Sequence, residues 1–265
     1  MINNFQTNTT ASGKVYIVGA GTGDAELITV KALKLIQQAD VILYDALLPQ
    51  SLLSESKRLA ELIFVGKRAE KHYQTQNQIN GKLIAHAKSG KLVVRLKGGD
   101  PLIFGRGSEE ALALSQAGIP FEIVPGISAL QTCSSYSSIP LTHRGVSRSF
   151  MAISGDEHSM NEIDFNWLGQ YKGTLVFFMA RKTFLTISSQ LIQSGMKRDT
   201  PLAVIENGGY DNQVVHTATL STAYEISPSQ DAAVLVIIGE TVNYHTILSQ
   251  TKQEVDYALS HVYEA

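Results

Sequence analysis

The chain has 265 residues, a net charge of −2 and a single cysteine, Cys133. This length suits one large domain or two smaller ones, and 44% hydrophobic against 17% charged residues describes a globular chain rather than a long disordered one. The apolar runs are far shorter than the roughly 20 residues that a membrane-spanning helix requires. One cysteine excludes an internal disulfide and a cysteine-based zinc site, and the polar first residues do not form a signal peptide. We therefore expect a cytoplasmic protein with no membrane partner.

The first half of the chain alternates short β-rich runs with helical stripes. The expected strands cover residues 14–19, 41–44, 62–65, 92–96 and 121–124. Apolar residues at helical spacing predict a helix from Ile28 to Ala39, with Asp24 as its cap, and further helices around residues 79–87 and 108–117. Strands that alternate with helices at this spacing indicate an α/β domain with a mainly parallel sheet and helices on both faces.

Beyond Pro140 the pattern changes to strands with one clear helix among them. The expected strands cover residues 150–153, 174–179, 202–205, 214–217 and 233–238, and the helix covers 184–192 with Gly195 as its C-cap. The short ENGGYDN segment predicts a hairpin, and hence a mixed sheet. The predicted organisation is a flexible tail (1–13), an N-terminal α/β domain (14–140), a C-terminal α/β domain (141–242) and a helical extension (243–265).

Two glycine-rich turns follow predicted strands of the first domain. GAGTGD (19–24) follows the first strand and GGDP (98–101) the fourth, so both turns are expected to open at the carboxyl edge of one sheet. Asp24 replaces the last glycine of a dinucleotide fingerprint, and the second turn lacks the Gly-Lys-Ser/Thr of a triphosphate loop. The turns suit a ligand with an adenosine portion and a cationic, carboxylate-bearing end. A nucleotide-dependent oxidoreductase, with Asp45 binding the ribose, is the alternative.

The segment 67–106 is strongly basic. It holds nine Lys or Arg and two acidic residues, a net charge of +7, which leaves −9 for the rest of the chain. Lys67, Arg68, His72 and Arg106 lie near the glycine-rich turns and are candidates for binding a polyanionic small molecule. For most of the other lysines, a solvated helix surface explains the charge equally well. Nucleic acid is not expected, because no repeat of alternating aromatic and basic residues accompanies the charge and the isoelectric point is near 6.4.

Long motifs in a fixed order resemble one known family. VGAGTGDAELIT, ADVILYDALL, VGKRAEKH, RLKGGDPLIFGRGSEEA, AGIPFEIVPGISA and SIPLTHR, followed by TLVFFMARKTF, TPLAVIENG and VLVIIGE, are similar to the uroporphyrinogen-III C-methyltransferases. These are S-adenosylmethionine-dependent tetrapyrrole methylases, and the resemblance covers residues 14–242. Siroheme synthases carry the same module fused to a dehydrogenase and chelatase part. The short segment before the first strand leads us to expect the methylase part alone.

The resemblance implies an activity and an architecture. It implies two successive methyl transfers from S-adenosylmethionine to uroporphyrinogen III, giving precorrin-2 for siroheme or cobalamin biosynthesis and S-adenosylhomocysteine as the second product. The nearest rival is another precorrin C-methyltransferase of the same family, which acts on a different ring carbon. The family has two α/β lobes with the ligand site between them and is typically homodimeric.

The resemblance also assigns residues. Asp45 and Lys67 match the family's proton acceptor and proton donor. The cofactor positions fall on Thr22, Gly98, Gly99, Asp100, Ile103, Ser128, Ala129, Met179, Ala203 and Gly208. Our candidates for binding substrate carboxylates are Arg68, Arg106, His143 and Arg144. No metal is expected, because the methyl group on a sulfonium is already activated.

The chain departs from the family pattern at several of these motifs. Thr22 stands where the family usually has proline, and Ser154-Gly155-Asp156 replaces the more usual Thr-Gly-His. The loss of proline removes a restriction on the backbone of the first turn. Neither change removes Asp45, Lys67 or the GGDP turn, so we expect a working enzyme.

Overall fold

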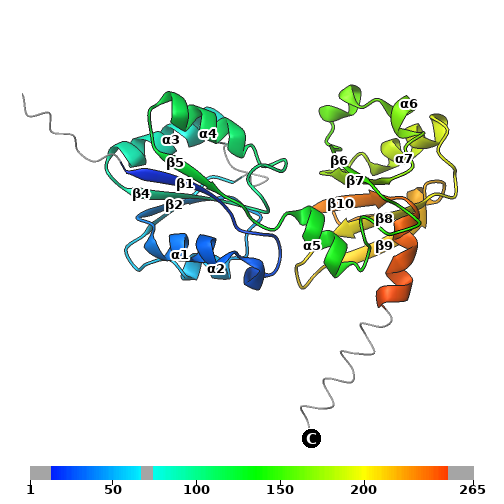
Figure 1. The fold of residues 1–265 in the computed structure, drawn as a ribbon, viewed down its shortest axis with the longest axis horizontal. Coiled ribbons are helices and arrows are strands. Elements are labelled where there is room, and N and C mark those ends of the chain that lie inside the picture. The colour runs from blue at the N-terminus through cyan, green and yellow to red at the C-terminus, as the bar shows by residue number, and fades with distance from the viewer. Residues whose placement is uncertain (1–12, 67–73, 250–265) are drawn as a thin grey trace, which may run out of the picture. The chain divides into compact units, whose positions relative to one another are not determined.

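The computed structural model describes residues 13–66 and 74–249. The chain divides into two compact units, residues 1–128 and 129–265 (Figure 1). The division falls between Ser128 and Ala129, earlier than the boundary expected after residue 140. The reason is the helix α5 (Ala129–Tyr136), which was not predicted from the sequence. Its residues Leu130 and Cys133 pack in a core cluster of the second unit.

The sheet of the first unit is entirely parallel, as expected. Its strands, in the order β3-β2-β4-β1-β5, are β3 (Glu61–Phe64), β2 (Val41–Tyr44), β4 (Leu92–Lys97), β1 (Lys14–Gly19) and β5 (Phe121–Val124). The central strands are apolar along most of their length because helices cover both faces of the sheet.

Helices pack on both faces of this sheet (Figure 1). One face carries α1 (Val30–Gln38) and α2 (Ser51–Ser54), and the other carries α3 (Gln76–Lys88) and α4 (Gly107–Gln116). The expected cap of α1 is wrong. Thr29 caps α1 by accepting the backbone N–H of Ala32, while Asp24 caps the short 3-10 helix η1 (Ala25–Leu27) that precedes it.

The second unit contains a mixed sheet, also as expected. Its strands, in the order β6-β7-β10-β8-β9, are β6 (Phe150–Ser154), β7 (Thr174–Phe178), β10 (Val234–Ile238), β8 (Pro201–Glu206) and β9 (Val214–Thr219). Only β6 and β7 pair in parallel; the other pairs are antiparallel, and β8 and β9 form the predicted hairpin.

Two core clusters cover the two faces of the second sheet. Leu175 and Phe177 of β7 pack with α6 (Phe165–Leu168) and α7 (Phe184–Gln193), whereas Val176 and Phe178 pack with α5. This alternation follows from the two-residue period of a strand. Gly195 follows the end of α7 in a left-handed conformation (φ +97°), and the N–H groups of Gly195 and Met196 bond to the carbonyls of Ile192 and Leu191. This is the glycine-terminated helix end that the sequence predicts.

Short helical turns complete the described chain: η2 (Ser159–Glu162), η3 (Ala223–Glu225), η4 (Glu240–Asn243) and a helical turn at 244–249. The predicted tail and most of the predicted C-terminal extension lie outside the described residues. Within the described part of the chain, none of the helices is long and apolar enough to span a bilayer.

Candidate active site

The carboxyl ends of all five strands of the first sheet lie at one edge. At this edge the chain enters the glycine-rich turns, reaches Asp45 and continues into the loops after β3 and β5. In the order β3, β2, β4, β1 and β5, the residues at this edge are Gly66, Asp45, Gly98, Gly19 and Pro125. Segments that are far apart in the sequence are therefore neighbours at this edge.

The two glycine-rich turns meet between β1 and β4. The N–H of Gly99 donates to the carbonyl of Gly21 at 2.7 Å, and the N–H of Gly21 donates back to Gly99 at 3.3 Å. The chain then leaves β1 for a helix on one face of the sheet and β4 for a helix on the other face. Such a point of divergence is where open α/β sheets bind ligands. The expectation that both turns open at one edge is confirmed.

Several of the glycines at this edge are required by the packing of the turns themselves. A Cβ atom on Gly126 would lie 2.4 Å from the carbonyl oxygen of Gly99, and one on Gly19 would lie 2.5 Å from the same oxygen. A Cβ on Gly98 would lie 2.5 Å from the carbonyl oxygen of Leu47, in the segment after β2. No side chain fits at such distances, so glycine allows three strand ends to come into backbone contact.

Asp100 ties two of these segments together. Its carboxylate accepts the N–H of Leu102 at 2.8 Å and the N–H of Gly126, after β5, at 3.2 Å. The sequence left open whether this carboxylate binds a ligand or caps its own turn. The structure shows the capping role, with both carboxylate oxygens bonded to backbone.

Asp45 lies at the exposed end of a group of four charged side chains. One oxygen of Asp45 is 2.6 Å from Nη2 of Arg95, and the other is 3.9 Å from Nζ of Lys97. Arg95 and Lys97 are in turn 2.9 Å and 3.1 Å from Oε1 of Glu110. We call Asp45, Arg95, Lys97 and Glu110 the buried charge network. Asp45, whose side chain is 27% exposed, is the member that reaches solvent; the other three are buried.

The network shifts the pKa values of its two basic groups in opposite directions. Burial opposes the charge on Arg95, but the adjacent Asp45 and Glu110 carboxylates outweigh it and hold the pKa of the guanidinium above its usual value. Burial, together with the neighbouring Arg95, lowers the pKa of the Lys97 ammonium. Arg95 therefore stays charged inside the protein, while the two carboxylates oppose the loss of charge that burial favours at Lys97.

The buried charge network was not predicted from the sequence. Arg95 and Lys97 contribute to the basic segment 67–106, yet neither lies on a solvated surface nor faces a ligand from the surface. They stand at i and i+2 in a strand that is otherwise apolar, and so share one face of a buried sheet. Two basic residues at that spacing in a buried strand are the signal that predicts an internal carboxylate partner.

The loop after β4 combines exposed apolar side chains with an unusual backbone. Leu102, Ile103 and Phe104 are all exposed, and Phe104 and Arg106 adopt left-handed conformations (φ +52° and +59°). Such conformations cost about 1–3 kcal/mol and concentrate at functional sites. The Arg106 guanidinium is held by the Glu109 carboxylate at 2.8 and 2.7 Å, a contact that raises the pKa of Arg106. In this structure the predicted carboxylate-binding arginine is thus paired within its own helix turn.

Thr22 has an unusual environment for a hydroxyl group. Its side-chain oxygen is buried and has no hydrogen-bond partner among the described residues. Ser128, at the end of the first unit, is also buried. Lys67, Arg68 and His72 lie outside the described residues.

In the second unit, Met179 and Gly208 follow strands that run in the same direction. β7 and β8 both pair antiparallel with β10, so their carboxyl ends lie at one edge of this sheet. Met179 is left-handed (φ +57°) with a half-exposed side chain, and Asn207 is left-handed as well (φ +48°). A Cβ on Gly208 would lie 2.2 Å from the sulfur of Cys133, so a side chain at this position would require the Cys133 side chain to move.

Three other positions of the second unit belong to its core or start a helix. Ala203 lies inside β8 with no exposed surface, in the cluster that contains Leu130 and Cys133, and so does not reach the edge. Ala129 is the first residue of α5. Cys133 is an ordinary core residue, as predicted, and burial raises the pKa of its thiol to about 12.

His143 and Arg144 lie in a tight turn of the second unit. The His143 ring stacks on Tyr244 with 4.3 Å between ring centroids, and its Nδ1 is 3.2 Å from the Tyr244 hydroxyl. The backbone groups of His143 and Ser147 bond to each other, and Gly145 between them has φ +86°. The helical turn at 244–249 thereby holds His143, while Arg144 is exposed.

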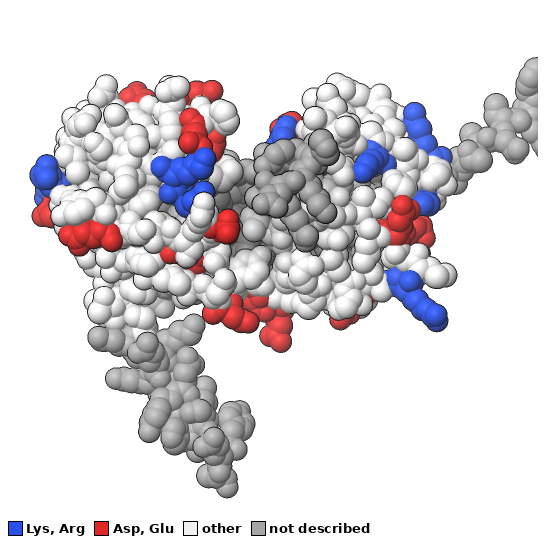
Figure 2. All heavy atoms as spheres, turned by 180° about the vertical axis from the view of Figure 1, so that it is seen from behind, with Lys and Arg blue, Asp and Glu red and all other residues white. Residues whose placement is uncertain are grey.

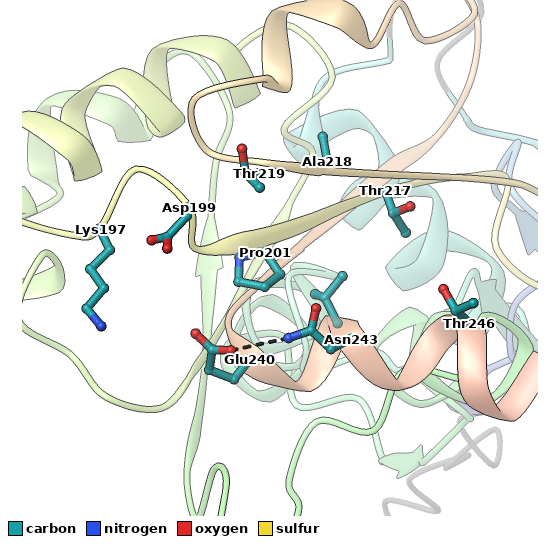
Figure 3. A pocket seen from close by; sticks show the side chains of 10 residues that line it. Lys197, Asp199, Pro201, Thr217, Ala218, Thr219, Glu240, Asn243 and Thr246 are labelled. Atoms are coloured by element: carbon teal, nitrogen blue, oxygen red, sulfur yellow. Dashed lines mark hydrogen bonds between the residues drawn. The ribbon is translucent and has the colours of Figure 1, made fainter.

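A cavity of about 400 Å³ lies elsewhere in the second unit (Figure 3). Its walls include Pro201, Thr217 and Thr219 of the β8–β9 hairpin. Asn243 points toward Glu240 and donates to its carboxylate at 3.2 Å. None of the ten residues that line this cavity is among the predicted site residues.

The distribution of charged and metal-binding side chains bears on the kind of ligand. On the face in Figure 2, Lys and Arg are interspersed with Asp and Glu rather than gathered into one broad basic patch. Within residues 13–66 and 74–249, no three His, Cys, Asp or Glu side chains form a group that could hold a metal ion. Because the two glycine-rich turns, the exposed apolar loop and Asp45 all lie at the carboxyl edge of the first unit's sheet, we take this edge as the candidate active site.

Comparison with known proteins identifies relatives over most of the chain. Residues 14–224 match the family model of tetrapyrrole (corrin/porphyrin) methylases. Siroheme synthases from Escherichia coli O139:H28 and Shigella boydii serotype 18 are each 47% identical over 230 residues, which cover 87% of this chain and 50% of theirs. The chain thus spans about half the length of these curated relatives.

Solved structures show the same fold. The Thermus thermophilus uroporphyrin-III C-methyltransferase complexed with S-adenyl homocysteine is 36% identical, with a TM-score of 0.75 over 87% of this chain and 99% of that one. Cobalt precorrin-4 methyltransferase is 27% identical, with a TM-score of 0.75 over 86% of this chain and 95% of that one. By its sequence match and by its fold, this chain belongs to the tetrapyrrole methylase family.

Proposed function

We propose that this chain transfers methyl groups from S-adenosylmethionine to uroporphyrinogen III, twice in succession, to give precorrin-2. The observation that carries the proposal is the convergence of both glycine-rich turns and Asp45 at one sheet edge. The 36% identity to a uroporphyrin-III C-methyltransferase that was solved with S-adenyl homocysteine supports the substrate and the cofactor. We also propose a cytoplasmic homodimer.

The chemistry of the edge residues fits this cofactor. S-adenosylmethionine supplies a methyl group on a positively charged sulfur. The Asp45 carboxylate, 27% exposed, offers a negative charge near which a cation is stabilised. Exposed Ile103 and Phe104 offer apolar surface for a flat base. The cofactor roles of Thr22, Gly98, Gly99, Asp100, Ile103, Ser128, Ala129, Met179, Ala203 and Gly208 stay predictions.

Asp45 is the residue to which we assign the proton transfer. Methyl transfer to a ring carbon leaves a positive charge on the macrocycle and a ring proton that has to be removed. A carboxylate held beside the reacting carbon stabilises that charge and accepts the proton. No covalent nucleophile is required, so the remaining task of the protein is to hold the methyl group and the carbon in line.

Arg106 and Arg144 are our candidates for binding the substrate's carboxylates, together with His143 and with Arg68 outside the described residues. Arg106 already holds a carboxylate, that of Glu109, in a two-point contact. The same fork geometry suits a substrate carboxylate, which would exchange with Glu109 on binding. Arg144 is exposed and able to reach a ligand.

A related methylation is the second candidate. The 27% identity and equal TM-score of cobalt precorrin-4 methyltransferase favour a tetrapyrrole methylase that acts on a different ring carbon. A nucleotide-dependent oxidoreductase is less consistent with the chain, because Asp24 stands where a dinucleotide fingerprint has its last glycine, and a carboxylate there would oppose a pyrophosphate.

A methyl-transfer assay tests the proposal. The purified chain is incubated anaerobically with uroporphyrinogen III and S-adenosylmethionine labelled in the methyl group, and the product is analysed by mass. We expect a product with two added methyl groups. Labelling of a precorrin but not of uroporphyrinogen III would favour the second candidate. Binding without turnover of either substrate would overturn the proposal.

A further inference from the structure

We propose that Glu110, a buried residue of α4, is a positioning residue for Asp45 and acts through Arg95. The inference rests on the proposed function, because it concerns the residue to which the proton transfer is assigned. It assigns a role to a side chain that has no exposed surface and lies behind the sheet edge.

Hydrogen bonds hold the Arg95 guanidinium on all of its nitrogens. Its Nε donates to Glu110 at 2.9 Å and its Nη2 to Asp45 at 2.6 Å. Its Nη1 is 3.1 Å from the carbonyl oxygen of Leu96 and 3.4 Å from that of Leu43. A planar guanidinium bonded on all three nitrogens has one orientation, and that orientation determines where the Asp45 carboxylate lies.

The Glu110 carboxylate accepts hydrogen bonds from two different elements of the first unit. Its Oε1 accepts from Arg95, from Lys97 at 3.1 Å and from Gln76 of α3 at 3.2 Å, whereas Oε2 has no partner among the described residues. One oxygen therefore anchors β4 and α3 to α4. Glu110 also follows Arg106 and the exposed loop by a single helical turn, so it links that loop to the network.

The positive and negative charges of the buried charge network balance. The network holds two positive and two negative groups, and three of the four are buried. Buried ion pairs contribute little net stability compared with apolar residues of similar size, so stability alone does not account for them. Without the Glu110 charge, Arg95 and Lys97 would both turn to Asp45 and draw its carboxylate inward, away from the surface where it would meet a substrate.

The test is a double-mutant cycle of Glu110→Gln and Asp45→Asn. Glutamine keeps the shape and one accepting oxygen of Glu110 but removes the charge. We expect Glu110→Gln to lower kcat for methyl transfer roughly 10- to 100-fold, as for a displaced reacting group, and to leave the affinity for S-adenosylhomocysteine unchanged in calorimetry. In the Asp45→Asn background, the same change should lower kcat no further.

Glu122→Gln is the matched control. Glu122 also bonds to two basic side chains, Lys14 and Lys31, but it lies on β5 and its network does not include Asp45. We expect this variant to keep full turnover. Equal losses in the two variants would show that the effect is general destabilisation and would overturn the positioning role.

Two further outcomes contradict the inference. Full turnover by Glu110→Gln would show that its charge does not position Asp45, and multiplied losses in the double variant would show that Glu110 acts independently of Asp45. If Glu110→Gln does not fold, the charge-balanced pair Lys97→Met with Glu110→Gln is measured. Because Lys97 is then absent, the expected loss of kcat follows from reorientation of Arg95 alone, and full turnover would overturn the positioning role.

The failure of this inference is distinguishable from failure of the proposed function. Absence of methyl transfer by the unaltered chain contradicts the proposed function alone. A crystal structure of Glu110→Gln gives a readout that does not depend on turnover. We expect the Asp45 carboxylate to move toward Lys97, and an Asp45–Lys97 distance unchanged at 3.9 Å would overturn the positioning role.

Discussion

At the scale of single residues, Asp45 shows how one side chain depends on its surroundings for its function. It follows a four-residue strand, and nothing beside it in the sequence indicates a partner. Its partners Arg95 and Lys97 come from the next strand of the sheet. The buried Arg95 and Lys97 hold the carboxylate on its protein side, and its other side is exposed to solvent. A positioned base requires this arrangement.

Asp45→Asn should separate chemistry from binding. The amide keeps the shape of the carboxylate but neither accepts a proton nor carries a charge, so we expect kcat to fall by roughly 10²–10⁴-fold. The affinity for S-adenosylhomocysteine, measured by calorimetry, should stay unchanged. Glu61→Gln, which alters an exposed ion pair with Lys91 at the start of β3, should affect neither quantity. Parallel loss of binding and turnover in Asp45→Asn would contradict the catalytic assignment.

At the scale of elements, the turns between strands and helices carry the site, and they are held by backbone contacts. Gly21 bonds to Gly99, and the Asp100 carboxylate bonds to Gly126. Together with the buried apolar side chains at these strand ends, the two contacts hold β1, β4 and β5 beside one another. The geometry of the edge depends on these few contacts.

Asp100→Ala should weaken the cofactor through the shape of the turn rather than through a lost ligand contact. The change leaves the N–H groups of Leu102 and Gly126 without their acceptor, which costs about 1–3 kcal/mol of folding free energy. We expect S-adenosylhomocysteine to bind roughly tenfold more weakly, equivalent to about 1.4 kcal/mol. The affinity of Asp100→Asn for S-adenosylhomocysteine should lie between that of the unaltered chain and that of Asp100→Ala, because the amide retains one accepting oxygen. Unchanged affinity in Asp100→Ala would show that the turn is not part of the binding site.

A pair of glycine substitutions tests the packing of the edge. Gly126→Ala places a Cβ 2.4 Å from the carbonyl oxygen of Gly99, so we expect it to destabilise the fold by roughly 3 kcal/mol or more. Gly81→Ala, in the middle of α3, meets nothing within 4 Å and should stabilise the protein by about 0.5–1 kcal/mol. Chemical denaturation measures both. A stable Gly126→Ala variant would mean that the strand ends are not packed as closely as the structure shows.

At the scale of the whole molecule, acidic side chains within each unit contact cations and backbone N–H groups of the same unit. The pKa values of Asp40, Glu61 and Glu122 in the first unit, and of Glu157 and Glu206 in the second, lie below their usual values. For Glu122, hydrogen bonds from Lys14 and Lys31 lower the pKa from 4.5 to about 2. The unfolded chain therefore binds more protons than the folded one in acid, and stability falls as the pH falls.

Glu122→Gln should reveal this linkage. The contribution of Glu122 is fully present above pH 4.5 and is lost as the pH falls toward 2, through the lowered pKa. Denaturation midpoints of the unaltered chain should thus exceed those of Glu122→Gln at neutral pH, and the difference should shrink in acid. It should also shrink in high salt, because the carboxylate is only partly buried. A difference that is constant with pH would contradict the ionic role of Glu122.

The sequence by itself determined the succession of strands along the chain and most of the helices, the parallel and mixed character of the two sheets, the two glycine-rich turns and the family. These features follow from patterns within a few residues, such as helical periodicity, apolar strands and glycine after a strand. Tertiary structure decided what α5 packs against, the capping role of Asp100 and the network around Asp45. Arg95 lies 50 positions from Asp45 and 15 from Glu110, so no local pattern joins them. The parallel sheet brings them together, and burial then requires that each charge has a partner.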